Sequence, residues 1–456
     1  MTTQSAASAS TAPGEPSTPR LIAYSSGGFA FNLYWQSLTL FLLFYYTDVM
    51  GLSPGAAGLI YLVASVWDGA IDPLIGALAD RTRSRWGGYR PYLLFGAPVL
   101  AVSFILLYYR PPLAGGALLA FVLAAHLWFR TCYAAVNVPF LALGARITSS
   151  AGKRGRISGF KMMFASVAGI VVASFTQPIA ATFGHNGFAV AAVLFAVCAS
   201  LVLPIVFLSV RERMPAPQTA ARLTSRAYWT SAMKNRAFVT LMIAVTFTNV
   251  CATVWGKSVL YYYKYYIGDE AAAKTGLALA AGAGLVIVPA WMAASRLIGK
   301  RMAWFASCGF GIVGLAAFAL FDVRTPLAMN GFLIFNEVCA VGWAFSFWAM
   351  LPDTVEYGQL HTGLRTEAFL FGLAGFFAKV SLGVGAGLFG AGLAFIGYRA
   401  NHAQTAETLA GMKALMVGVP LAGYCIASLT MIFSPMRKGE HERIVLALEP
   451  TEPLSP

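Results

Sequence analysis

The sequence predicts an all-α membrane protein of about twelve transmembrane helices, and three observations support this fold class. First, 58% of the residues are hydrophobic and only 11% are charged, with a mean hydropathy of +0.68, whereas soluble domains carry about 25% charged residues. Second, the apolar residues gather in stretches that reach the length of about 20 residues needed to cross a bilayer. Third, Lys and Arg concentrate in alternate loops.

The apolar stretches fall into two groups of six on either side of a basic, proline-containing segment. The first group covers residues 25–50, 56–80, 92–109, 116–146, 158–183 and 187–210, and the second covers 237–267, 272–295, 302–321, 327–352, 367–398 and 411–433. We therefore expect a tail (1–20), an N-terminal six-helix half (21–210), a linker (211–236), a C-terminal six-helix half (237–433) and a second tail (434–456).

Loop charge predicts the orientation of these spans. Basic residues follow spans two, four and eight, namely Arg81, Arg83, Arg85, Arg90, Lys153, Arg154, Arg156, Arg296, Lys300 and Arg301, while the loops after spans one and five contain no Lys or Arg. Because cytoplasmic loops are enriched in these residues, both tails and the linker should be cytoplasmic. The net charge of +14 then reflects orientation in the membrane and implies no nucleic-acid partner.

The two ends of the chain and the cysteines add little to this architecture. Residues 1–20 are rich in Ser, Thr, Ala and Pro and lack an apolar core, so we expect a disordered cytoplasmic tail with no cleavable signal peptide. The six cysteines stand singly, with no CxxC pair or spaced His, so neither a metal site nor a disulfide framework is implied. Aromatic clusters such as the tyrosines at 261–266 are interpreted as interfacial belt residues.

Enzymatic chemistry is not indicated anywhere in the chain. No GxxxxGK segment is present, which argues against ATP-driven pumping. No nucleophile triad or metal constellation appears in the loops, so we predict that the protein is not an enzyme and has no cofactor.

Two carboxylates in the second span are the strongest candidates for chemistry, because an ionisable side chain inside a membrane costs several kcal/mol. The sequence VWDGAIDP places Asp68 and Asp72 four residues apart, hence on one face of a helix. Such a pair either shares a proton (H+) or coordinates a small cation such as Na+ through its oxygens. The alternative is that one Asp simply pairs with a basic residue of a neighbouring helix.

Other intramembrane charges should complete this site. Lys379 stands in the glycine-rich eleventh stretch; if it meets both aspartates, the local charge is minus one, which leaves room for one cation. Arg130 is either a contact for a substrate anion or a structural partner, and a structural ion pair is favoured for Glu337. His126 is more typical of a satisfied polar residue than of a proton relay, and Lys257 approaches the outer end of span seven. Trp348 could stack on a sugar ring.

The loop after span two resembles a motif of the major facilitator superfamily. In GALADRTRSRWG, from Gly76 to Gly87, the residues Gly76, Asp80, Arg81 and Arg85 match the motif, in which an Asp and Arg residues fasten the cytoplasmic ends of helices. A degraded counterpart, SRLIGKR from Ser295, lies at the equivalent place in the second half. The resemblance implies two six-helix halves with a site near the midplane between them.

Longer stretches resemble the glycoside-pentoside-hexuronide:cation symporters, the family of the melibiose and glucuronide carriers. They include FYYTDVMGLSPGAAG, WDGAIDPLIGALADRTRSRWGGYRP, VNVPFLALGARIT and LPDTVEYGQLHTGLRTE, with Lys379 at the family's helix-eleven lysine position. The resemblance implies that Asp68 and Asp72 form the cation site. It also implies sugar contacts in helices one and four, where melibiose carriers have aspartates and this chain has Asn32 and Asn137.

Those two amides lead to a more specific expectation. They remove two negative charges, so an anionic hexuronide is less repelled and glucuronide carriers are the nearer comparison. Fewer carboxylate oxygens near the site, with Ala134 three residues before Asn137, also favour a proton over sodium.

We therefore expect a bacterial inner-membrane symporter that moves a glycoside or hexuronide with a cation by alternating access. A carrier of a lysolipid-like cargo and a non-transporting sugar receptor are the alternatives.

Overall fold

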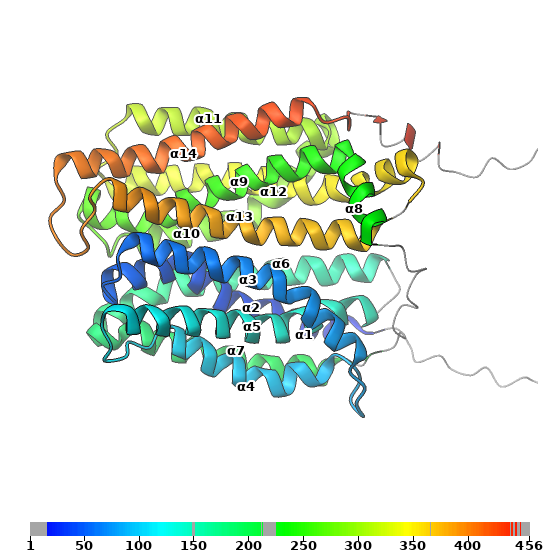
Figure 1. Ribbon diagram of the computed structural model, residues 1–456, viewed down its shortest axis with the longest axis horizontal. Coiled ribbons are helices and arrows are strands. Elements are labelled where there is room, and N and C mark those ends of the chain that lie inside the picture. Colours follow the sequence, from blue (N-terminus) through cyan, green and yellow to red (C-terminus); the bar gives the residue numbers. More distant parts are fainter. Residues whose placement is uncertain are drawn as a thin grey trace, which may run out of the picture.

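The computed structural model consists of two bundles of membrane-length helices that lie side by side (Figure 1). It describes residues 16–147, 151–210, 212, 225–364, 366–437, 439–440, 443–444 and 447. The start of α1 and the end of α14 lie at the same end of the molecule, together with α8. The expected 1–20 and 434–456 tails fall largely outside the described residues.

The N-terminal bundle contains seven α-helices and three short π or 3-10 turns. Its elements are α1 (Thr18–Ser25), α2 (Gly27–Ser37), η1 (Leu38–Leu42), η2 (Tyr45–Val49), α3 (Pro54–Arg81), α4 (Arg90–Leu107), α5 (Gly115–Ile147), α6 (Ala151–Phe183), η3 (Gly184–Asn186) and α7 (Gly187–Ser209).

The C-terminal bundle repeats this plan. Its elements are α8 (Ser225–Lys234), α9 (Arg236–Tyr261), η4 (Tyr262–Ile267), α10 (Ala273–Ile298), α11 (Lys300–Leu320), α12 (Pro326–Thr362), α13 (Glu367–Phe395) and α14 (Ala406–Ile432). The helix α8 lies within the segment expected to be a linker, of which residues 211 and 213–224 are outside the described part of the chain.

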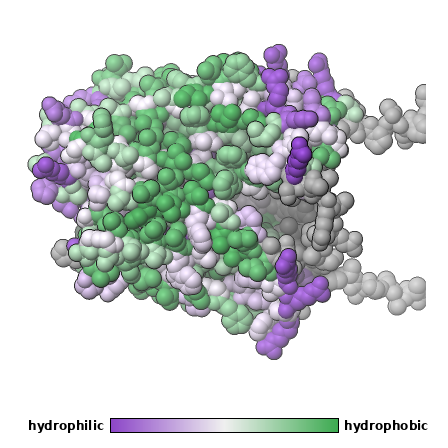
Figure 2. All heavy atoms as spheres, viewed as in Figure 1, coloured by the Kyte–Doolittle hydropathy of each residue, from purple (hydrophilic) through white to green (hydrophobic). Residues whose placement is uncertain are grey.

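The expected all-α membrane architecture is confirmed. Eleven helices of the described residues are long and apolar enough to cross a membrane. The remaining expected span, 25–50, is helical but divided among α1, α2, η1 and η2. A green apolar band covers the middle of the visible surface and purple polar residues gather at its two ends (Figure 2), as a lipid-facing surface requires.

The two halves meet most closely where α3 lies against α13, and glycines make this approach possible. A Cβ on Gly383 would lie 2.5 Å from Cβ of Ser65, and one on Gly390 would collide with the backbone of Pro54 and Gly58. Small residues let membrane helices approach closely. The contact brings α13 beside the helix that carries Asp68 and Asp72.

Within each half, an arginine at the start of one helix fastens the end of another. In the first half Arg90 donates to the carbonyl of Phe207 at 2.7 Å, and in the second Arg301 donates to the carbonyl of Met431 at 2.9 Å. The first contact joins α4 to α7 and the second joins α11 to α14, so each links the third membrane span of a half to its sixth. Each half therefore has the same kind of internal anchor, in agreement with a repeated six-helix unit.

Candidate functional site

The two aspartates lie in the middle of α3, on the side that meets the second half. Asp68 is completely buried, whereas the side chain of Asp72 is 29% exposed. One oxygen of each, Oδ1, is buried without a hydrogen-bond partner. Unpartnered buried carboxylate oxygens are costly, so each is an open position for a proton or a cation.

Two cationic side chains contact the other carboxylate oxygen, Oδ2, of the aspartates. Nη1 of Arg130, from α5, lies 3.2 Å from Oδ2 of Asp68, and Nζ of Lys379, from α13, lies 3.2 Å from the same oxygen. Lys379 also forms an ion pair with Oδ2 of Asp72. The Lys379 contacts cross between the halves.

The charge of this cluster differs from the sequence expectation. The sum of minus one counted Asp68, Asp72 and Lys379 only, but Arg130 also belongs to the cluster. Two carboxylates and two cations sum to zero. The sum of minus one was therefore wrong, because the partner of Arg130 could not be read from helical spacing alone.

His126 contacts Arg130 through a different guanidinium nitrogen from the one that faces Asp68. Nε of Arg130 lies 3.4 Å from Nε2 of His126, and the hydroxyl of Tyr46 lies 3.3 Å from Nδ1. Because an arginine nitrogen can only donate, Nε2 accepts and the proton sits on Nδ1, facing Tyr46. The imidazole is thus a neutral, satisfied residue that positions the guanidinium.

A cavity of about 130 Å³ opens beside the cluster, between the halves. Its polar and aromatic lining comes from both halves: Trp35, Thr39, Tyr61, Arg130, Thr253 and Lys257. The guanidinium of Arg130 lies 5.4 Å from the ring centre of Trp35. Aromatic faces beside fixed charges are typical of sites for small polar ligands.

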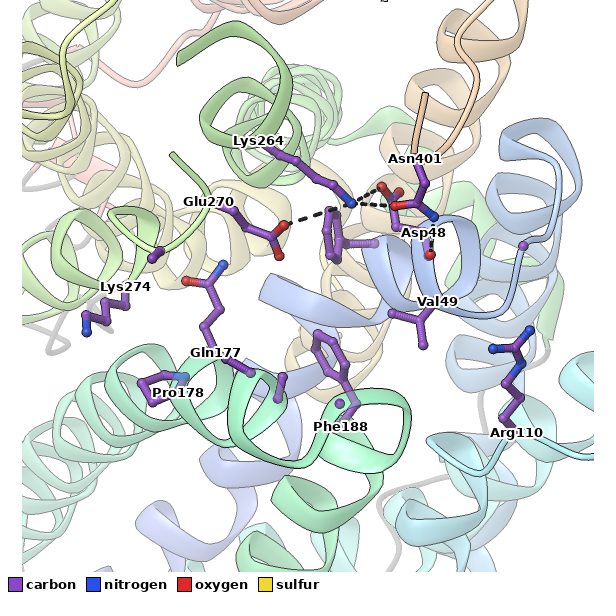
Figure 3. A pocket seen from close by; sticks show the side chains of 16 residues that line it. Asp48, Val49, Arg110, Gln177, Pro178, Phe188, Lys264, Glu270, Lys274 and Asn401 are labelled. Carbon is purple, nitrogen blue, oxygen red and sulfur yellow. Dashed lines mark hydrogen bonds and ion pairs between the residues drawn. The ribbon is translucent and has the colours of Figure 1, made fainter. Parts of the chain in front are cut away.

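A second polar cluster joins the halves at the end opposite the chain termini, and the sequence reading missed it. Asp48 in η2 accepts hydrogen bonds from Lys264 at 2.9 Å, from Tyr265 at 2.5 Å and from Tyr398 at 2.9 Å. Asn401 donates to the carbonyl of Asp48 at 2.7 Å. Figure 3 shows Lys264 directed at Asp48 and Asn401, which line a recess of about 930 Å³.

The interfacial interpretation of the neighbouring tyrosines was wrong for three of them. Tyr261, Tyr262 and Tyr263 are at most 1% exposed. The hydroxyl of Tyr261 lies 2.7 Å from Oγ1 of Thr47 in the other half. Tyrosines at the end of a membrane span can form an aromatic belt at the membrane surface or pack inside the protein. The amino-acid composition is the same in both cases, so the sequence could not distinguish them.

Other expected site residues lie apart from the cluster. The amide of Asn32 donates to the carbonyl of Gly28 on its own helix at 2.8 Å. Asn137 lies on α5 two turns after Arg130, and neither amide lines the 130 Å³ cavity. Trp348 is 57% exposed and its ring contacts Phe347.

The structure describes only part of the loop motif that begins at Gly76. The side chain of Asp80 lies outside the described residues, Arg81 is exposed, and Arg85 lies over the ring of Trp86 at 4.2 Å. Gly76 lies beside Val138, to which a Cβ would approach at 3.8 Å.

Glu212 fastens this loop in a way that the motif did not predict. It accepts hydrogen bonds from the backbone N–H of Gly88, Tyr89 and Arg90 at 2.6–3.2 Å.

The pairing expected for Glu337 is not found. No ion pair joins it to a described residue, and it stands beside Gly284 of α10, where a Cβ would lie 3.9 Å from Oε1.

Comparison with known proteins agrees with this architecture. The family described as MFS/sugar transport protein matches residues 23–438. The chain is 29% identical to the "Uncharacterized symporter YnaJ" of Bacillus subtilis, over 94% of each chain. It is 29% identical to the "Isoprimeverose transporter" of Lactiplantibacillus pentosus, over 92% of this chain and 88% of that one. It is 26% identical to the "Glucuronide carrier protein homolog" of Escherichia coli, over 94% and 95%.

Solved structures share the fold at low identity. A bacterial homolog of the human lysosomal transporter Spinster superposes with a TM-score of 0.66 over 94% of this chain and 98% of the other, at 12% identity. The nucleoside transporter NupG gives 0.63 over 92% and 100%, at 14% identity. These likenesses concern the fold alone. From the family match and the symporter relatives together, this chain belongs to the glycoside-pentoside-hexuronide:cation symporters of the major facilitator superfamily and is a multi-pass membrane transporter of sugars or glycosides, not an enzyme.

Proposed function

We propose that this transporter carries a glycoside or hexuronide together with a proton, using Asp68 and Asp72 as the coupling site. The observation that carries the proposal is the buried cluster in which Lys379 bridges both aspartates across the two halves. A group that changes charge at such a bridge changes the attraction between the halves, which is what alternating access needs.

The ion pairs suggest how coupling works. When a proton binds Asp72, the charge attraction between Asp72 and Lys379 is lost. Removing one partner of a fully buried pair costs about 3–5 kcal/mol, and this is an upper bound here because both side chains are partly exposed. Substrate bound at Arg130 and Lys379 would replace the lost interaction. Movement of the carrier is then favoured only when both proton and substrate are bound, or when neither is.

A proton is a better match than sodium for a neutral cluster. Sodium needs several oxygen ligands and a net negative charge around it. Arg130 and Lys379 already neutralise the two carboxylates, so a metal ion would face two fixed cations. A proton needs only one open oxygen, and Oδ1 of Asp68 or Asp72 supplies it.

The relatives support the proposed substrates. Printed names among them include an isoprimeverose transporter and a glucuronide carrier homolog. Arg130, Lys379 and the cavity beside them are the proposed substrate contacts, and Asn32, Asn137 and Trp348 are proposed to contribute in another state of the cycle. We also propose a bacterial inner-membrane location with both termini cytoplasmic.

One observation favours the alternative of an amphiphilic cargo. An apolar cleft of about 350 Å³ lies between α6 and α10 and is lined by Phe160, Met162, Met163, Leu285, Val288 and Met292, among others. Such a cleft suits an acyl chain. Lysophospholipid uptake by proteoliposomes would support this second candidate.

The test is uptake by proteoliposomes that contain the purified protein. A panel of labelled glycosides and uronides is offered with an inward proton gradient, an inward sodium gradient, or neither. Accumulation driven by the proton gradient alone is expected. Accumulation that follows sodium at constant pH would contradict proton coupling, and uptake of lysophospholipid with no sugar uptake would contradict the substrate class.

A further inference from the structure

Lys257 is a buried lysine whose charge has no counterpart. It lies on α9 and is 5% exposed. Its Nζ lies 3.9 Å from the ring centre of Tyr61 and 3.5 Å from the carbonyl of Thr39, both in the other half. No carboxylate of the described residues lies within ion-pair distance of it.

Lys257 shares its cavity with Arg130, and the two cations determine the charge of that space. The four side chains of the aspartate cluster sum to zero, so Lys257 adds one uncompensated positive charge. A lone charge inside a membrane protein is expensive and marks a functional position by default. An anion that enters the cavity would remove this cost.

We propose that Lys257, together with Arg130, binds the acidic group of a monoanionic glycoside, a carboxylate or a sulfonate on the sugar ring. This inference rests on the proposed transport function and names the substrate class for the same site. Trp35 and Tyr61 line the cavity beside the two cations, and aromatic faces of this kind cover the apolar side of a sugar ring. Lys257 is thus the residue that selects acidic over neutral glycosides.

The size of the cavity agrees with binding of one end of the substrate. Its volume of about 130 Å³ is well below the roughly 300–1,000 Å³ of pockets that enclose a whole drug-sized ligand. An acidic group and part of its ring fit such a space. The aglycone would extend along the boundary between the halves.

The experiment measures binding to the purified full-length protein by isothermal titration calorimetry. The probes are phenyl β-glucuronide, phenyl β-glucoside and the analogue with a sulfonate at the same carbon. Lys257→Met removes the charge at similar length, and Lys257→Arg retains it. Lys161→Met is the matched control, because Nζ of Lys161 also lies over an aromatic ring, that of Phe140 at 4.8 Å, but Lys161 does not line the cavity.

The unmodified protein should bind an acidic probe more tightly than the neutral one. Lys257→Met should weaken acidic binding by about tenfold or more, as loss of a buried charge partner does, and should weaken glucoside binding by a clearly smaller factor. Lys257→Arg and Lys161→Met should keep the preference. Comparison of the carboxylate and sulfonate probes identifies the acid.

Two results would overturn the inference while leaving the proposed function intact. One is equal weakening of acidic and neutral probes in Lys257→Met when Lys257→Arg restores both. The other is a preference of the unmodified protein for the neutral glucoside. Failure of the function itself is distinct, because then the unmodified protein would accumulate no glycoside of either kind under a proton gradient.

Discussion

Asp68 and Asp72 occupy unequal positions although both lie on one face of α3. Asp68 is fully buried and held by both Arg130 and Lys379, while Asp72 is partly exposed and held by Lys379 alone. Protonating Asp68 would leave two cations with weakened partners, and protonating Asp72 would affect one. Under the proposed proton coupling, Asp72 is therefore the better entry point for the proton, and Asp68 would hold Arg130 and Lys379 in place.

Neutralising either aspartate should abolish gradient-driven accumulation. Asp72→Asn keeps the Arg130–Asp68 ion pair, so substrate counterflow should survive in this variant. Asp68→Asn leaves Arg130 without its carboxylate, a change that costs about 3–5 kcal/mol in a buried pair, so counterflow and thermal stability should both fall. The measurement is accumulation and counterflow in proteoliposomes. If the double variant Asp68→Asn with Asp72→Asn concentrates substrate at the unmodified level, the coupling site lies elsewhere.

The sequence predicted part of this site because intramembrane charges are rare. Asp68, Asp72 and Lys379 stood out for that reason, but the sequence offered their meeting only as a condition of the charge argument, and the packing of α13 against α3 brings them together. The sequence could not identify the ion-pair partner of Arg130. The four-residue spacing between His126 and Arg130 shows only that these two residues share one face of a helix. The isolation of Lys257 and the burial of Tyr261 depend on packing between halves, which no local pattern encodes.

At the scale of elements, two π-helical segments, η2 and η4, build the contact between the halves at the end opposite the start of α1. The first membrane span of each half ends in such a segment: η2 carries Asp48, and η4, which follows α9, carries Lys264 and Tyr265. A π turn reorients side chains relative to a regular helix and often occurs at functional sites. Here it directs an acid and its donors at one another across the boundary.

Removing the acid should loosen the contact between the halves at the end opposite the start of α1. Asp48→Asn removes the charge that Lys264, Tyr265 and Tyr398 share, so the two halves should separate more often at this end. Asp322→Asn is the matched control, because Asp322 contacts Tyr266 and Arg324 within one half. Spin labels at Ala114 and Ala403, exposed loop positions of the two halves at this end, report the distance by double electron–electron resonance. An unchanged distance distribution in Asp48→Asn would show that the contact does not hold this end closed.

The close contact of α3 and α13 gives a second prediction at this scale. Gly383 lies one turn after Lys379, and an added methyl group would meet Cβ of Ser65 at 2.5 Å. Gly383→Ala should therefore push α13 away and separate Lys379 from the aspartates, at a cost of about 1–3 kcal/mol. Gly375→Ala on the same helix meets nothing within 4 Å and should be tolerated. Melting temperature in detergent and proton-driven uptake should both fall only in Gly383→Ala; equal behaviour of the two variants would refute the argument.

At the scale of the whole molecule, each half behaves as a fastened unit and the boundary carries the exchangeable contacts. The Arg90–Phe207 and Arg301–Met431 bonds stay within halves, while the contacts of Lys379, Lys257 and Asp48 cross between them. The paired six-helix plan was predictable because span length and loop charge are local properties. The division of the first span and the helix α8 were not, because neither leaves a clear hydropathy signal.

The orientation of the whole molecule is the remaining prediction. The α3–α4 loop, which contains Arg83, and the last turn of α10, which contains Arg296, lie at the end where α1 begins and α14 ends (Figure 1). Since the cytoplasmic side attracts Lys and Arg, this end should face the cytoplasm. In a background without the six native cysteines, Ser84→Cys tests this end and Gly116→Cys tests the other. A membrane-impermeant maleimide should label the cysteine at 116 in intact cells, and the one at 84 only after lysis. Labelling of position 84 in intact cells, with position 116 protected, would reverse the topology and with it the direction in which the proton gradient drives transport.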